Sequence, residues 1–206
     1  AYIPGYITFT PADGNTTSPG VSSSFGFFFD TATNVSIDAL GFAGDTRWSN
    51  NTSYTVKLWS FINQGASPSD FTEIATATFT QGNPYTLQDN YYWQDISGGP
   101  ISLPDTSSGV DPTFQKGYVI SAIGDFSGSN GFIFPQIVSS ATTPAGSVTF
   151  DPKIDISSYG GEINGFNDQT DPNGFFEVPI YPTAGLGNNG YSNANLSFAP
   201  VPPVPG

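Results

Sequence analysis

The segment Tyr54-Thr55-Val56-Lys57-Leu58-Trp59 decides the fold class of this chain. In it, apolar Tyr, Val and Leu side chains alternate with Thr, Lys and Trp, and a period of two residues is typical of a β-strand that buries one face. The segment from Ala75 to Phe79 alternates in the same way, with Thr at every second position. Both segments therefore predict β-strands.

Short aromatic and β-branched runs like these recur along the whole chain. The 24 Gly and 18 Pro residues are spread between them, and this close punctuation is typical of sandwiches and barrels. No stretch has the periodicity of an amphipathic helix. We expect strands at Tyr6 to Thr10, Ser24 to Phe29, Val35 to Phe42, Tyr54 to Ile62, Thr72 to Thr80, Tyr91 to Ile96, Gly117 to Ile123, Gly131 to Phe134, Ser147 to Phe150, Phe175 to Ile180 and Asn195 to Ala199.

These strands predict an all-β protein, an antiparallel β-sandwich of jelly-roll type with an extended N-terminal strand arm. Residues 1–20 form the arm and its linker, residues 21–199 form a single sandwich domain, and residues 200–206 form a Pro-rich tail. The polar stretches from Gly160 to Gly174 and from Thr183 to Asn195 read as long loops at one end of the sandwich, where binding functions are usually found.

Three residue types are missing from the 206 residues: methionine, cysteine and histidine. Their absence excludes Cys nucleophiles, His bases and thiolate or imidazole metal ligands. Because the first residue is Ala1 and not Met, we expect a processed end, with a cleaved export signal favoured over simple removal of the initiator Met. Without disulfides, the stability of the chain has to come from packing.

The charge of the chain further limits its partners. Only 10% of the residues are charged, and four basic residues oppose seventeen acidic ones. A net charge of -13 leaves little to neutralise a phosphate backbone, so we expect no nucleic acid partner and no anionic membrane. No run approaches eighteen apolar residues, and the chain as given therefore has no expected membrane span. The low charge and the Ser, Thr and Asn content favour an extracellular or cell-surface location.

The central half of the chain, from Phe25 to Gly124, resembles a domain of unknown function that recurs in secreted and surface bacterial proteins, often beside carbohydrate-active modules. The residues that carry the resemblance are Ser24 to Phe29, Ile37 to Phe42, Tyr54 to Ser60, Glu73 to Phe79, Trp93 to Ile96 and Gly117 to Ala122. The end, from Asn195 to Gly206 with its Val-Pro repeats, is similar to the region before the sorting tail of PEP-CTERM proteins, which are exported bacterial surface proteins. The hydrophobic span and basic cluster of that tail do not follow here.

Paired carboxylates could make a glycosidase, in which one acid donates a proton and the other attacks or activates water. The chain offers Glu73, Glu162 and Glu177 beside fourteen Asp residues, most of which adjoin Gly, Pro, Ser or Thr. Glu73 reads as the solvated end of a strand and Glu177 as an outward residue of another, while Asp beside Gly or Pro is turn chemistry. We therefore expect no enzyme and no catalytic residue.

Calcium is the candidate cofactor, because it needs only oxygen ligands and this chain is rich in them. The densest cluster, from Asn167 to Gly174, contains Asp168 and Asp171. These two residues are the candidate metal ligands. The cluster lacks the terminal Glu of an EF-hand loop, and its sequence can form a tight turn without a metal ion.

Exposed aromatic side chains could stack on sugar rings. Trp59 and Trp93 lie in strand patterns and are expected to pack in the core. Trp48 stands beside Arg47 in a polar segment, and it is the candidate ligand-binding residue for an extracellular polysaccharide.

The start of the chain favours self-assembly. Residues 2–10 form a strand-like arm on a linker of Gly, Ser, Thr and Pro, and such an arm can pair with its own sheet or with a neighbouring copy. The predicted subunit contacts are Tyr2, Ile3, Tyr6, Ile7 and Phe9. The leading hypothesis is a non-enzymatic, exported structural protein that forms a filament, sheath or matrix of identical subunits. The alternative is a carbohydrate-binding surface module that uses Trp48 or, with calcium, Asp168.

Overall fold

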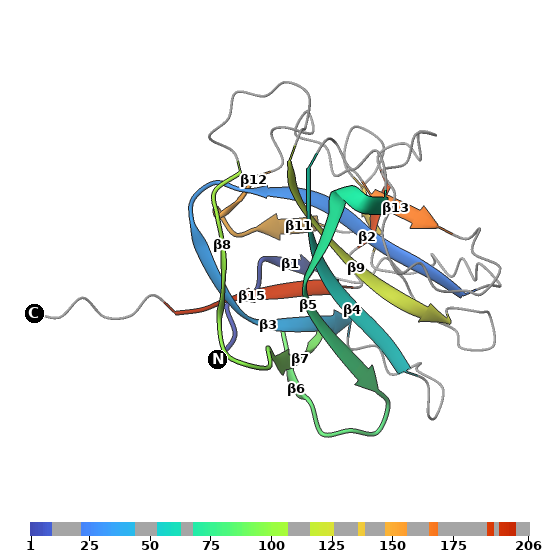
Figure 1. Ribbon diagram of the computed structural model, residues 1–206. Helices are drawn as coiled ribbons and strands as arrows, with labels where there is room; N and C mark the ends of the chain where they lie inside the picture. The colour runs from blue at the N-terminus through green and yellow to red at the C-terminus, as the bar shows by residue number, and fades with distance from the viewer. Residues whose placement is uncertain are drawn as a thin grey trace, which may run out of the picture.

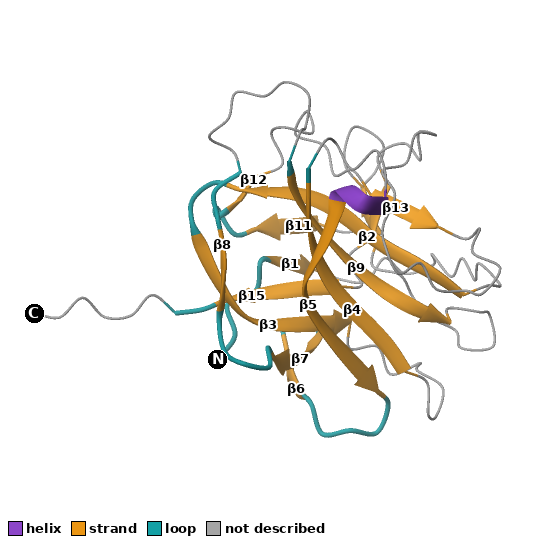
Figure 2. Ribbon diagram, viewed as in Figure 1, coloured by secondary structure: helices purple, strands orange, loops and turns teal. Residues whose placement is uncertain are grey.

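The computed structural model describes residues 1–9, 22–43, 53–62, 68–106, 116–125, 136–138, 147–155, 165–168, 189–191 and 194–200. In these residues the chain is almost entirely β-strand and turn (Figure 1, Figure 2). Their one helical element is the short 3-10 helix η2 (Pro68–Asp70), and no helix among them is long and apolar enough to cross a membrane.

Two antiparallel sheets form the sandwich. The larger sheet has the strand order β12 (Ile154–Asp155), β2 (Ser22–Thr31), β9 (Gly117–Asp125), β4 (Ser53–Phe61) and β5 (Phe71–Thr80), and β13 (Gly165–Asp168) also pairs with β2. The smaller sheet has the order β15 (Ala194–Phe198), β3 (Val35–Ala43), β7 (Tyr91–Asp95) and β6 (Thr86–Gln88), and β8 (Ile101–Leu103) also pairs with β3.

Two shorter antiparallel pairs accompany the main sheets. The arm strand β1 (Tyr6–Phe9) pairs with β11 (Ser147–Phe150), and β10 (Gln136–Val138) pairs with β14 (Asn189–Tyr191). The predicted all-β sandwich with an N-terminal strand arm is therefore confirmed, while its jelly-roll type stays a prediction.

The main core lies between the two sheets and is built from the alternating residues of the sequence. Tyr54, Val56 and Leu58 are completely buried, as the alternation predicts. The ring of Phe42 on β3 stacks on Tyr54 of β4 with centroids 4.8 Å apart and planes 14° from parallel. This contact joins the two sheets directly.

A second apolar cluster consists of Phe28, Trp59, Phe61, Phe71 and Val119. Trp59 alternates with the core-facing Leu58 and belongs to the other face of the larger sheet, yet it is only 4% exposed. The ring of Phe61 packs edge-on against Phe28 at 5.6 Å. The larger sheet is therefore buried on both faces in this region, which explains why its strands carry so many aromatic residues.

The expected strands agree with the observed ones in most places and differ in several. Ser147–Phe150 has the expected bounds, and the expected strands starting at Tyr6, Ser24, Val35, Tyr54, Thr72, Tyr91, Gly117 and Asn195 are present with shifted ends. The reading of residues 160–174 and 183–195 as loops was wrong in part, because β13, β14 and the start of β15 lie there and are held by their partner strands. The expected strands at residues 131–134 and 175–180 lie outside the described residues.

Candidate functional site

The N-terminal arm makes the most distinctive set of contacts in the described part of the chain. Gly5 donates its amide N–H to the carbonyl of Leu196 at 2.8 Å and accepts a bond from the amide of Asp151, also at 2.8 Å. Ile3 accepts a 2.9 Å bond from the amide of Phe198, and Pro4 forms a bridge with Ser197. The arm is thus hydrogen-bonded on both sides, to β15 on one and to the residue after β11 on the other.

Tyr2 is held by its backbone as well as by its side chain. The amide of Tyr2 donates to Oε1 of Gln88 at 3.0 Å, and the carbonyl of Tyr2 accepts from Nε2 of Gln88 at 2.8 Å. A primary amide that donates and accepts in this way replaces the backbone of a neighbouring strand. The phenol of Tyr2 donates to Oδ1 of Asp95 at 2.9 Å.

The ring of Tyr2 lies flat against the indole of Trp93. The centroids are 5.2 Å apart and the planes deviate by 17°, a geometry in which aromatic pairs attract each other beyond simple area burial. We call Gln88, Trp93, Asp95 and Ser197 the arm site. Ser197 completes it by accepting a 3.1 Å bond from the amide of Ile3 at its hydroxyl.

Trp93 is fixed by its neighbours on the two adjacent strands, β6 and β3. Its Nε1 donates to the carbonyl of Gln88 at 3.0 Å, and its ring lies over Gly41 of the adjacent strand β3. A Cβ atom at Gly41 would stand 2.8 Å from Cζ3 of the indole, closer than carbon atoms approach. The glycine therefore makes room for the ring that supports Tyr2.

The environment of Tyr2 keeps its phenol protonated. Burial raises the pKa of Tyr2, and the hydrogen bond to Asp95, the charge of Asp95 and the charge of Asp38 raise it further. A protonated phenol is the form that donates to a carboxylate. The arm site thus favours an aromatic residue with a hydroxyl group at position 2.

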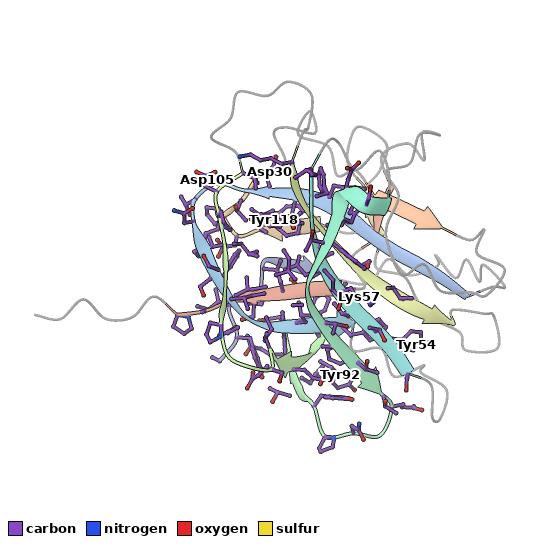
Figure 3. The ribbon with its side chains drawn as sticks, in the orientation of Figure 1. Asp30, Tyr54, Lys57, Tyr92, Asp105 and Tyr118 are labelled. Carbon is purple, nitrogen blue, oxygen red and sulfur yellow. The ribbon has the colours of Figure 1, made fainter. Side chains whose placement is uncertain are left out.

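A second polar cluster lies where the segment after β8 crosses the end of β2 (Figure 3). Asp30 is only 2% exposed and accepts a 2.8 Å bond from the hydroxyl of Thr106. Tyr118 donates to the carbonyl of Pro104 at 2.7 Å, and Thr31 donates its hydroxyl to the same carbonyl at 3.0 Å. Burial, followed by the charges of Asp30 and Asp105, raises the pKa of Tyr118 to about 12.

This second cluster is structural in its chemistry. Its hydrogen bonds connect the backbone of residues 104–106 to the ends of β2 and β9. The hydroxyl of Thr106 donates to Asp30 and accepts from the amide of Thr31, so it is bonded twice to the end of β2.

The predicted binding residues divide into those that the structure describes and those that it does not. Trp48 and Asp171 lie outside the described residues, as do Glu162 and Glu177. Asp168 ends β13 and is paired in register with Ser24. Within the described ranges, no group of three or more His, Cys, Asp or Glu residues is placed to hold a metal ion. The calcium site therefore stays a prediction.

The other aromatic and acidic candidates have structural positions. Trp59 and Trp93 are 4% and 2% exposed, which confirms that they pack in the interior. Glu73 is exposed and bonds Nζ of Lys57 at 2.8 Å, so its expected place at the solvated end of a strand is also confirmed.

The predicted subunit contacts all belong to the arm. Tyr2 and Ile3 contact the arm site of their own chain, and Tyr6, Ile7 and Phe9 lie in β1, paired with β11 of the same chain. Their predicted role between subunits stays a prediction. Sequence reasoning missed Gln88, Asp95 and Ser197. The Asp89-Asn90 pair after Gln88 takes positive φ angles of 52° and 66° and forms a tight hairpin turn. This turn pairs Gln88 with Tyr91 and gives no signal for its contact with the arm.

Comparison with known proteins adds no relative. No protein-family model, no curated protein and no solved structure matched the chain. The resemblance to a secreted bacterial domain and to PEP-CTERM proteins has no support from these comparisons and stays a prediction.

Proposed function

We propose that this protein is a non-enzymatic structural subunit that assembles outside the cell or on its surface, with the N-terminal arm of one copy bound in the arm site of the next. The observation that carries the proposal is the double hydrogen bonding of the arm, between β15 on one side and Asp151 on the other. An arm held in this way is an inserted strand, and a strand from another copy makes the same bonds equally well.

The sequence distances within the arm site support exchange. Tyr2 contacts residues 86 and 93 positions away, and Ile3 contacts a residue 194 positions away. None of these contacts depends on the connection from the arm to β2. The same hydrogen bonds can therefore form with the arm of another chain.

The length of the connection supports exchange as well. Residues 10–21 join β1 to β2, and twelve residues in extended form span about 40 Å. That length exceeds the radius of a domain of this size, so the arm can reach a neighbouring copy. Because donor and acceptor are different surfaces, each copy gives an arm and receives one, and such head-to-tail contacts extend into filaments when they do not close into a ring.

Removal of residues 1–10 tests the proposal. We expect electron microscopy and light scattering to detect filaments or oligomers of the full chain and none of the shortened chain. The shortened chain is expected to keep its far-UV circular dichroism and a cooperative unfolding transition. Oligomers that persist unchanged in the shortened chain would show that the arm does not join subunits.

Adding the arm back as a separate peptide of residues 1–10 provides the matched control. The peptide is expected to bind the shortened chain and to cap its open site, whereas a peptide with Tyr2 replaced by Ala binds more weakly. The alternative function, carbohydrate binding through Trp48 or Asp168, gains no specific support from the described residues.

A further inference from the structure

In the described part of the molecule, the strand β5 ends the larger sheet and has a long edge without a partner strand. It has 10 residues, pairs with β4 on one side, and has no strand on its other side in the described part of the molecule. Side chains along it are exposed at Thr72, Glu73, Thr76 and Thr78. Unpaired edges of this length are sites where another chain can add a strand.

The backbone of β5 shows which groups face outward. The carbonyl of Thr78 accepts a bond from Nε2 of Gln94, and the amide of Thr80 donates to the hydroxyl of Tyr85 at 2.8 Å. Outward groups recur at every second residue of an antiparallel strand, so the amide and carbonyl of Thr76 also point away from β4. Side chains of this chain thus cap one end of the edge, and Thr76 lies in the part that they leave open.

The usual protections of a sheet edge are scarce on β5. Its sequence contains no Lys and no Pro, which are the residues that most often prevent edge pairing. The single ionisable side chain, Glu73, is already paired with Lys57 at 2.8 Å. The protective features that the described residues show are one irregularity in register, opposite Leu58 and Trp59, and the side-chain bonds to the backbone of Thr78 and Thr80.

We propose that β5 pairs with β5 of a second copy, antiparallel and about a two-fold axis near Thr76, so that the larger sheets of the two copies become continuous. Identical copies associate most often through such two-fold contacts. With Thr76 opposite Thr76, the two Glu73 side chains are separated by about 20 Å of strand. This exceeds the screening length of about 8 Å at physiological ionic strength, whereas parallel pairing would place the two carboxylates side by side.

The exposed apolar residues near β5 fit the same arrangement. Ile62 is 56% exposed and follows β4 at the Phe71 end of the edge, where its amide bonds the carbonyl of Asp70. Leu87 is 57% exposed and lies two residues after Tyr85, which packs on Phe79 near the other end. An antiparallel pair brings the Phe71 end of one copy, which carries Ile62, towards the Thr80 end of the other, which carries Leu87.

Replacement of Thr76 by Pro tests this contact. Proline removes the outward N–H and is tolerated on an edge strand when that N–H is not part of the ladder. Thr76→Ala keeps the N–H and is the matched control. All variants, and the locked parent, also carry Pro4→Cys and Ser197→Cys. A disulfide between these two positions of the same chain keeps the arm in its own arm site. Any dimer that remains is therefore independent of the proposed arm exchange.

Sedimentation velocity over a range of concentrations gives the readout. The locked parent and Thr76→Ala are expected to form a dimer that strengthens from 0.15 to 0.5 M NaCl, because salt screens the repulsion between copies of charge -13. Thr76→Pro is expected to weaken the dimer at least tenfold while keeping the same unfolding midpoint as Thr76→Ala within a few degrees. If Thr76→Pro lowers that midpoint further, Thr76→Lys replaces it, because two like charges then meet at the axis. A locked parent that stays monomeric, or a Thr76→Pro or Thr76→Lys variant that dimerises as strongly as the locked parent, would overturn the proposal.

Discussion

The ring of Tyr2 stacks on the indole of Trp93 with centroids 5.2 Å apart, although 91 positions separate the two residues. The contact joins the first residues of the chain to a central strand of the smaller sheet. The phenol of Tyr2 is hydrogen-bonded to Asp95, and the backbone of Tyr2 is hydrogen-bonded to Gln88. The arm is therefore bound as a peptide ligand is bound, through one aromatic side chain and a set of backbone hydrogen bonds.

Tyr2→Ala is expected to lower the free energy of unfolding by about 1–3 kcal/mol, because it removes an aromatic pair worth roughly 0.5–1.5 kcal/mol and a hydrogen bond of similar size. Tyr2→Phe keeps the ring and should lose only the hydrogen-bond part. Urea unfolding followed by tryptophan fluorescence measures both. Equal losses in the two variants would show that the stack contributes nothing.

Gly41→Ala is expected to destabilise the protein by about 1–3 kcal/mol, the usual cost of overpacking, since the new Cβ would lie 2.8 Å from the indole of Trp93. In a Trp93→Phe background the smaller ring leaves more space, so the same substitution should cost less. A double-mutant cycle of urea midpoints tests the coupling. Identical costs in both backgrounds would contradict the assigned role of Gly41.

The hydroxyl group of Thr106 is expected to contribute more to the stability of the fold than the volume of the Thr106 side chain. Thr106→Val removes the donor to Asp30 and the acceptor for the amide of Thr31, and an unsatisfied buried polar group costs about 1–3 kcal/mol. Thr106→Ser keeps both bonds and should cost clearly less. Thermal unfolding of the two variants provides the measurement, and the reverse order of stability would sink this interpretation.

Stability should fall with pH in the alkaline range because of Tyr118. Its pKa is about 12 in the folded chain, above the ordinary value of about 10 for an unfolded tyrosine. The unfolded chain therefore loses the proton first, so the stabilisation is complete below about pH 10 and is lost as the pH rises towards 12. Urea midpoints between pH 8 and 12 should show a shallower decline in Tyr118→Phe than in the parent, and parallel declines would contradict the assignment.

The strands of the core could be predicted because their sequence signal is local. Tyr54, Val56 and Leu58 alternate with polar residues, and the structure buries all of them. The signal was weaker where a strand is short or polar: β6 and β8 have 3 residues each, and β13 lies in a stretch rich in Gly and Asn whose strand form is imposed by pairing with β2.

The arm itself could be predicted, but its binding site could not. The strand-like pattern of residues 2–10 is a property of that segment alone, whereas the arm site combines residues from β6, β7 and β15. Gln88 is a partner of Tyr2 only because the folded sheets bring the two together. Sequence periodicity carries no information on such contacts, and this is why Gln88, Asp95 and Ser197 were missed.

The most direct test of arm exchange uses the bridge between Pro4 and Ser197. The flanking bonds, from Gly5 to Leu196 and from Phe198 to Ile3, mark a pair of the closely spaced type, with Cα atoms about 4.5 Å apart, which suits a disulfide. The chain contains no natural cysteine, so two single variants, Pro4→Cys and Ser197→Cys, can be mixed, unfolded and refolded together, and oxidised.

If the arm of one copy binds the arm site of another, mass spectrometry will find a disulfide that joins position 4 of one chain to position 197 of the other. Its yield will lie well above the level obtained when Pro4→Cys is mixed with a control variant that carries its cysteine at exposed Thr33. If the arm stays in its own chain, the mixture will give no more cross-linked product than the control, and the proposal of assembly by arm exchange will be contradicted.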